Sequence, residues 1–191
     1  MKQRLILASG SPRRTEIFRQ NGLDPEIRIP RVKEIFPQGI SVESTVMYLA
    51  LLKALAIEKE IHQGFIVSAD TVVYNGRILG KPIDERDALN MLKELRGKAH
   101  WVLTGVAIID GKTQNRRVFY EATEVYFTRY SIVEMEEYIK TGEPLDKAGA
   151  YALQGEWGRH IHRVVGNRDN VIGFPWERGA KELREMGYMG V

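Results

Sequence analysis

The residues near the amino terminus combine hydroxyls and arginines in a pattern that suits anion binding. Residues 9–14 read Ser-Gly-Ser-Pro-Arg-Arg and follow a short apolar run of strand character. A serine followed by proline is typical of a helix start, so Arg13 and Arg14 fall in the first turn, where the helix dipole normally favours acidic residues. Exposed backbone N–H groups, the hydroxyls of Ser9 and Ser11 and two guanidinium groups together suit phosphate. A capped helix with two solvated arginines is the structural alternative.

A carboxylate after an apolar segment is the second candidate. Residues 65–70 are predicted to form a buried strand that ends on Asp70. Ligands of open α/β sheets bind outside the carboxyl ends of the strands, and a carboxylate there can hold a metal ion or act as a general base. An aspartate that ends the strand and starts a turn is the alternative.

A lysine falls inside the apolar face of the helix predicted to begin near Ser41. The apolar positions, at steps of three or four, are Val42, Val46, Leu49 and Ala56. Lys53 lies within this stripe, where a lysine either extends its amino group to solvent or holds an anion or carboxylate. Helical register alone favours the extended form.

Two further lysines lie in glycine-containing segments. Lys81 stands between Gly80 and a proline; the glycine spacing and that proline argue against a Walker-type phosphate loop, although glycine permits a close approach to a ligand. Residues 145–155 concentrate small residues around Lys147 and Gln154, which is typical of either ligand approach or tight sheet packing. The amide of Gln154 could read a base through a paired donor and acceptor.

These side chains together suit metal-dependent cleavage of a polyphosphate. Cations and a divalent metal stabilise charge that develops on phosphate oxygens, and a carboxylate positions or deprotonates water. The set comprises Arg13, Arg14, Lys53, Lys81, Glu34 and Asp70.

The composition narrows the class of protein. The 191 residues suffice for one large domain or two small lobes, and 43% hydrophobic and 28% charged residues are ordinary for a globular protein. A net charge of +3 is too small for a nucleic-acid-binding face, and the absence of cysteine excludes disulfides and thiolate chemistry. The four histidines show no zinc-site spacing. No membrane span or signal pattern is recognised, so a cytoplasmic protein without membrane or stable nucleic-acid partners is expected.

The expected elements alternate between strands and helices, which indicates an α/β protein with a mixed sheet. Asn75 and Gly76 predict a hairpin within residues 71–79, and Ser131 with Glu134 predicts a capping box. The other expected helices cover residues 11–20, 84–96, 131–142 and 175–187, and the other strands residues 26–29, 101–109 and 117–128.

Over nearly its whole length the sequence resembles the Maf family of nucleoside triphosphate pyrophosphatases. The matching motifs, in the family's order, are residues 9–14, Glu34, 52–54, 68–73, 80–82, 104–106, 146–151 and 171–175. The resemblance implies a single domain over residues 1–191: a mixed, twisted central sheet flanked by helices, with two lobes around one cleft, as in inosine triphosphate pyrophosphatases. It also implies cleavage between the α and β phosphates with Mg²⁺ or Mn²⁺, and makes a homodimer an expectation.

The resemblance assigns roles by position. Asp70 would activate water, and whether it also binds the metal beside Glu34 stays open. The expected substrate-binding residues are Ser9, Ser11, Arg13, Arg14, Lys53, Thr71, Lys81, Lys147 and Gln154. One departure concerns the residue before Glu34, often acidic in the family and here Lys33, which puts metal affinity in question.

Three positions resemble the dTTP/UTP pyrophosphatases of the family, namely Arg13, Thr71 and Gln154. The 7-methyl-GTP branch would carry an aromatic residue in place of Arg13 and a glutamate in place of Gln154. An amide suits uracil or thymine, whose edge offers a donor and acceptors. We therefore expect hydrolysis of dTTP, UTP or modified pyrimidine nucleotides. The alternatives are the same chemistry on another base, or a non-catalytic regulator of septum formation that binds nucleotide or nucleic acid.

Overall fold

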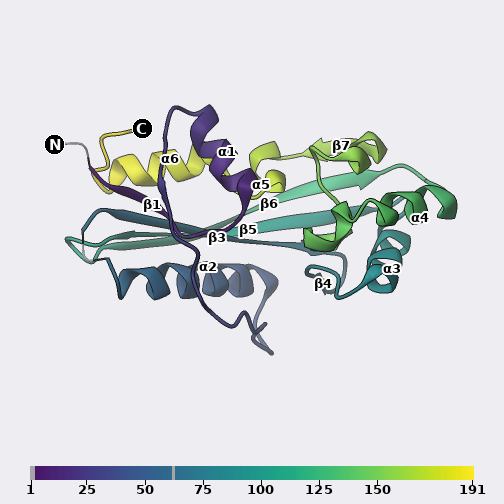
Figure 1. Cartoon of the computed structure of the whole chain (residues 1–191), viewed down its shortest axis with the longest axis horizontal. Coiled ribbons are helices and arrows are strands. Elements are labelled where there is room, and N and C mark those ends of the chain that lie inside the picture. The colour runs from purple at the N-terminus through teal and green to yellow at the C-terminus, as the bar shows by residue number, and fades with distance from the viewer. Residues whose placement is uncertain (1–2, 62) are drawn as a thin grey trace. The chain divides into compact units, whose positions relative to one another are not determined.

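The computed structural model describes residues 3–61 and 63–191, whose seven strands form one mixed sheet (Figure 1). The strand order is β2-β1-β3-β5-β6-β7, and β4 pairs with β3. β1 is parallel to both β2 and β3. β4 is antiparallel to β3, and β7 is antiparallel to β6. The strands are β1 (Leu5–Leu7), β2 (Glu26–Ile27), β3 (Phe65–Tyr74), β4 (Ile78–Leu79), β5 (Ala99–Asp110), β6 (Arg116–Phe127) and β7 (Ile161–Val165).

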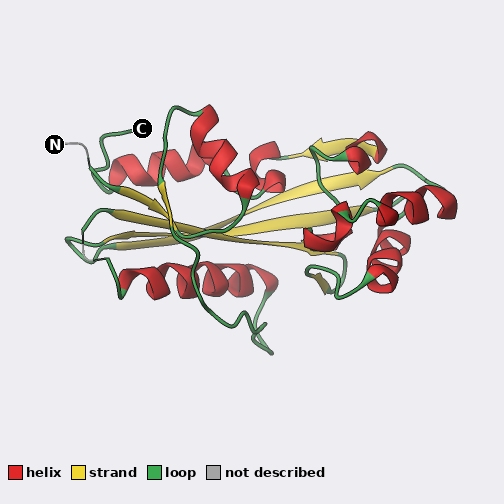
Figure 2. Cartoon of the chain, viewed as in Figure 1, coloured by secondary structure: helices red, strands yellow, loops and turns green. Residues whose placement is uncertain are grey.

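Helices flank the sheet, as predicted (Figure 2). Three predicted helix starts are confirmed by their caps. The side chains of Ser41, Asp84 and Ser131 each accept a hydrogen bond from a backbone N–H of the first turn, and Ser131 forms the predicted capping box. The α-helices are α1 (Pro12–Gln20), α2 (Val42–Glu58), α3 (Glu85–Leu95), α4 (Ile132–Lys140), α5 (Arg168–Ile172) and α6 (Trp176–Glu185). Short 3-10 helices are η1 (Glu143–Asp146), η2 (Ala148–Ala150) and η3 (Glu156–His160).

The chain divides into two compact units, each assembled from segments that are distant in sequence. The first unit comprises Met1–Asp70, Thr104–Glu121 and Gly173–Val191, and the second comprises Thr71–Leu103 and Ala122–Ile172. Strands β3, β5 and β6 contribute residues to both. No helix among the described residues has both the length and the apolar character needed to cross a bilayer.

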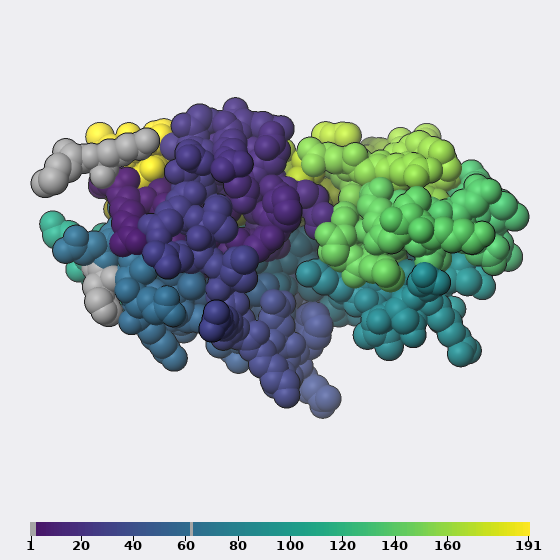
Figure 3. Space-filling model, viewed as in Figure 1, coloured from purple at the N-terminus to yellow at the C-terminus, as the bar shows by residue number. Residues whose placement is uncertain are grey.

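In the first unit, α2 covers one face of the sheet while α1 and α6 lie on the other (Figure 1). The α2 side of this core is built from small and branched side chains, among them Ile6, Ala50 and Ala54. A Cβ at Gly105 would lie 2.2 Å from the carbonyl oxygen of Val46, so glycine at this position lets α2 press onto β5. The loop between β2 and α2 lies on the surface of this unit (Figure 3).

The buried face of α2 differs from the predicted stripe. Val46 and Leu49 are buried as expected, but Val42 and Ala56 are only half-buried, and the buried face includes Lys53. Val42 lies in the first turn and Ala56 at the margin of the face defined by 100° per residue, so both have fewer neighbours.

The second unit has a separate core rich in aromatic residues, in which a histidine is buried. His100 is 2% exposed, and its Nε2 forms a 2.7 Å hydrogen bond with the Tyr151 hydroxyl. Both rings pack against Phe127, with centroid distances of 4.9 and 4.8 Å. Burial lowers the pKa of His100 from 6.5 to about 4.

This histidine predicts a loss of stability in mild acid. Because the pKa is lower in the folded chain than in the unfolded chain, protons bind the unfolded state first as the pH falls from about 6.5 to about 4. The free energy of unfolding should therefore decrease by about 2–3 kcal/mol between pH 7.5 and pH 4.5 from this group alone. Urea unfolding of the wild type and of His100→Gln at both pH values measures this decrease in each protein. Equal pH dependence in the two proteins would contradict the assignment.

Candidate active site

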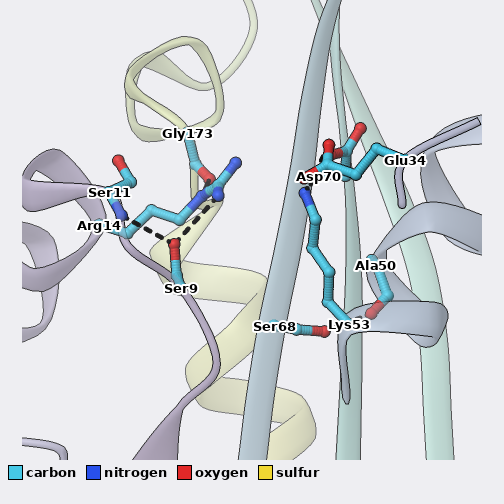
Figure 4. Close-up of polar contacts among 9 residues, drawn as sticks. All are labelled: Ser9, Ser11, Arg14, Glu34, Ala50, Lys53, Ser68, Asp70 and Gly173. Carbon is cyan, nitrogen blue, oxygen red and sulfur yellow. Dashed lines mark hydrogen bonds and ion pairs between the residues drawn. The ribbon is translucent and has the colours of Figure 1, made fainter. Parts of the chain in front are cut away.

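Two hydrogen bonds hold Arg14 beside the turn after β1, and a third lies within that turn (Figure 4). The Ser9 hydroxyl oxygen accepts from the Ser11 backbone N–H at 3.1 Å and from Arg14 Nη1 at 3.2 Å. Arg14 Nε donates to the Gly173 carbonyl at 2.8 Å. Ser11 occupies the predicted N-cap position of α1, but its side chain makes no capping bond. Ser9 is therefore the residue that fixes the turn.

The electrostatic surroundings of Arg14 mix burial with charges of both signs. Burial lowers the pKa of the guanidinium group, Asp70 opposes that shift, Arg13 adds to it and Glu34 opposes it. An arginine keeps its charge through such shifts. Arg14 is thus a fixed cation within electrostatic reach of two carboxylates, and Arg13 lies beside it, half-buried, in the first turn of α1.

A second group of charges joins a helix, a strand and a loop. Lys53 Nζ, on α2, lies 2.5 Å from Asp70 Oδ1 on β3 and 3.1 Å from Glu34 Oε2 in the loop between β2 and α2. The expectation that Lys53 extends to solvent is wrong, because its side chain is only 10% exposed. Two carboxylates compensate for the cost of removing the ammonium group from water.

Asp70 lies within a strand, and the prediction that the strand ends there is wrong. β3 continues to Tyr74 and forms the predicted hairpin with β4. The neighbouring β1 ends at Leu7, opposite Val67, and its chain then turns away through Ser9. Asp70 is therefore three residues beyond the last β1 pair, close to the carboxyl end of β1 rather than at the end of its own strand. Figure 4 shows the Arg14 group and the Lys53 group on opposite sides of β3.

The remaining predicted site residues belong to the second unit. Thr71 directly follows Asp70 on β3 and is half-buried, whereas Lys81 and Gln154 are exposed. Lys147 Nζ contacts the Asp146 carboxylate and donates to the Glu143 carbonyl at 3.2 Å. The backbone N–H of Gly149 donates to the Gly80 carbonyl at 3.0 Å, which joins the Lys81 and Lys147 loops.

Sequence reasoning missed three partners of the predicted residues. Asp146 and Glu143 hold the amino group of Lys147, and the Gly173 carbonyl holds Arg14. Asp146 and Gly173 fall within matched motifs, which was an available signal, but no local pattern specifies a contact between Gly173 and a residue 159 positions away.

The two carboxylates in the first unit fit a divalent metal ion. No group of three or more possible His, Asp or Glu ligands occurs among the described residues, which exclude His62. Glu34 and Asp70 nevertheless direct oxygens at one cationic atom, the Nζ of Lys53. Mg²⁺ is commonly held by one or two carboxylates together with substrate phosphates. Glu34 and Asp70 therefore have the chemistry required, and the exposed Lys33 takes no part in this group.

A mixed α/β sheet with fixed cations and paired carboxylates beside the end of a strand has the features of the α/β proteins that bind anionic ligands there. Residues 4–186 match the family described as "Maf-like protein". The chain belongs to the Maf family, which confirms the resemblance inferred from its motifs.

Curated relatives match over nearly the full length. One from Caldicellulosiruptor bescii, called dTTP/UTP pyrophosphatase, is 43% identical over 97% of this chain and 96% of its own. Another with the same name, from Pelotomaculum thermopropionicum, is 41% identical over 96% and 97%. Among solved structures, the Ham1 protein of Staphylococcus aureus has a TM-score of 0.52 at 13% identity, covering 96% of this chain and 100% of that one. That likeness concerns the fold alone and confirms the predicted fold class.

Proposed function

We propose that this protein is a nucleoside triphosphate pyrophosphatase that hydrolyses dTTP and UTP to the nucleoside monophosphate and pyrophosphate. The observation that carries the proposal is the Asp70 carboxylate, buried and bonded to Lys53 beside Glu34 and within electrostatic reach of Arg14. A protein that merely bound nucleotide would not need a carboxylate among cations, since a carboxylate repels phosphate unless a metal ion lies between them. The names of the full-length relatives support the same activity.

In this proposal Asp70 takes a proton from the attacking water. The water oxygen forms a bond to phosphorus, the anhydride bond between the α and β phosphates breaks, and the electron pair leaves with pyrophosphate. Lys53 orients the carboxylate through its 2.5 Å contact. Arg14, fixed by Ser9, binds phosphate oxygens and stabilises the charge that develops on them.

Glu34 and Asp70 would hold the divalent metal, Mg²⁺ or Mn²⁺. A bound metal neutralises phosphate charge and orients the polyphosphate chain. Lys81 and Lys147, with the Ser11 hydroxyl, are proposed as the other phosphate-binding groups. We place the reaction in the cytoplasm, where nucleoside triphosphates are made and consumed.

Base selection is assigned to Arg13, Thr71 and Gln154. Replacing Gln154 by glutamate should lower kcat/KM for dTTP and UTP by about tenfold, because the carboxylate lacks the donor that pairs with a pyrimidine carbonyl. Gln154 is exposed, so the melting temperature should stay within about 1 °C of the wild type. Measurement of kcat/KM for dTTP, UTP and 7-methyl-GTP tests this. If the ratios of kcat/KM among the three substrates are the same in the variant and the wild type, Gln154 does not select the base.

One experiment tests the proposed function as a whole. A panel of nucleoside triphosphates is incubated with Mg²⁺ or Mn²⁺, and pyrophosphate is measured separately from orthophosphate. Pyrophosphate release from dTTP and UTP, abolished by EDTA, is expected. Preference for 7-methyl-GTP would shift the substrate class, and nucleotide binding without turnover would favour the regulator of septum formation. Light scattering of the same sample tests the homodimer that the family resemblance leads us to expect.

A further inference from the structure

Two consecutive residues of the second unit adopt left-handed backbone conformations in a buried turn. Gly149 has φ +66° and Ala150 has φ +62°, and Ala150 is fully buried. A residue with a Cβ adopts this conformation at a cost in free energy, so surrounding contacts must hold it. The turn separates Lys147, whose side chain is only 11% exposed, from the exposed Gln154; the proposed function assigns phosphate binding to the first and base selection to the second.

Contacts with two other segments hold the first half of the turn. The Gly149 backbone N–H donates to the Gly80 carbonyl at 3.0 Å. A Cβ built on Gly149 would lie 2.7 Å from Val73 Cγ2, so the turn sits directly on β3. The Gly80 contact ties the position of this turn to the loop that carries Lys81.

A buried hydrogen bond holds the second half. Tyr151 is 5% exposed, and its hydroxyl lies 2.7 Å from Nε2 of His100 on β5. The Tyr151 ring also packs edge-on against Phe127 of β6, at a centroid distance of 4.8 Å. The ring contacts of Tyr151 with Phe127 and with His100 would survive loss of the hydroxyl, whereas the hydrogen bond to His100 would not.

We propose that Tyr151 is a positioning residue: its hydroxyl, held by His100, fixes the Gly149–Ala150 turn and thereby the placement of Lys81 and Lys147 relative to one another. This inference rests on the proposed function, in which both lysines bind phosphate. Tyr151 lies in the core and acts through the two loops, without touching substrate.

The test compares two buried tyrosines that each lose one hydroxyl. Tyr151→Phe removes the bond to His100, and the control Tyr130→Phe removes a 2.7 Å bond to the Leu92 carbonyl in the same core. Tyr151→Phe should raise KM for dTTP about tenfold with kcat within about twofold of wild type, because misplaced cations weaken phosphate binding. Tyr130→Phe should leave KM unchanged. Both should lower the melting temperature.

Inorganic tripolyphosphate, which lacks a base, separates the possible outcomes. Its affinity, measured by calorimetry, should fall in Tyr151→Phe by the same factor as the rise in KM and stay constant in Tyr130→Phe. Equal KM values and equal tripolyphosphate affinities in the two variants would overturn the positioning role while leaving the proposed function standing. A wild type that binds tripolyphosphate but hydrolyses no nucleotide would overturn the proposed function, and the affinity comparison would still decide whether Tyr151 positions the lysine loops.

Discussion

Asp70→Asn should lower kcat for dTTP hydrolysis by about 10³-fold or more, because an amide cannot take the proton from water. The substitution keeps the size of the side chain and an oxygen that can accept a hydrogen bond from Lys53. In the wild type, Lys53 Nζ lies 2.5 Å from Asp70 Oδ1. The fold and the phosphate-binding cations should therefore persist. Calorimetry should show that tripolyphosphate still binds, and single-turnover kinetics should show that the chemical step has been lost.

The matched control for this variant is Asp110→Asn. Asp110 is also buried, at the end of β5, but its carboxylate accepts hydrogen bonds from the Lys112 backbone and the Thr113 hydroxyl within a turn. These bonds lower the pKa of Asp110 against the opposing effect of burial. Loss of the charge should lower the melting temperature and leave kcat intact. An Asp70→Asn protein with kcat within tenfold of wild type would refute Asp70 as the water-activating group.

The starts of α3 and α4 were predictable because their causes are local. Asp84 and Ser131 each meet a backbone N–H three residues later, and this spacing is visible in the sequence. The hairpin at Asn75 likewise depends on the two residues of its turn. The five-residue helix α5 carries no such signal, since it is too short to show a periodic apolar face, and it was not predicted.

The candidate site was predictable in its residue types but less so in its contacts. Arg14, Lys53 and Asp70 were identified from motifs, whereas the burial of Lys53 depends on Glu34 reaching it from a loop 19 residues away. The helical register of α2 contains no information about that loop, so register alone favoured a Lys53 side chain that extends to solvent. The surroundings of Asp70 also depend on a neighbouring strand. The last pair between β1 and β3 is Leu7 with Val67, so β1 ends before it reaches Asp70, although β3 itself continues.

The contacts of Lys147, in the second unit, were also not predictable from the sequence. The small residues around it indicated either a close approach to a ligand or tight sheet packing, and neither interpretation includes the contact that its amino group makes with the adjacent Asp146. A phosphate at Lys147 would share its amino group with Asp146, because an ammonium group has three donors. Lys81 is exposed and has no hydrogen bond or ion pair to any described residue, so no carboxylate competes with phosphate for its amino group.

Lys53→Met should produce a protein whose stability depends on divalent metal. Removal of one partner from a buried ion pair leaves uncompensated charge, so the free energy of unfolding in EDTA should fall by about 3 kcal/mol, at the lower end of the usual range because Glu34 is half exposed. Mg²⁺ or Mn²⁺ should restore much of this loss, since the carboxylates of Glu34 and Asp70 already converge on one cationic atom.

Urea unfolding with and without metal measures the effect, with Lys59→Met as the control. Lys59 is an exposed lysine at the end of the same helix, so its loss should change neither stability nor metal dependence. Metal should stabilise Lys53→Met more than wild type, because in the wild type the ammonium group competes for the same oxygens. If metal stabilises both proteins equally, Glu34 and Asp70 do not share a cation with Lys53, and the metal must be held by other groups.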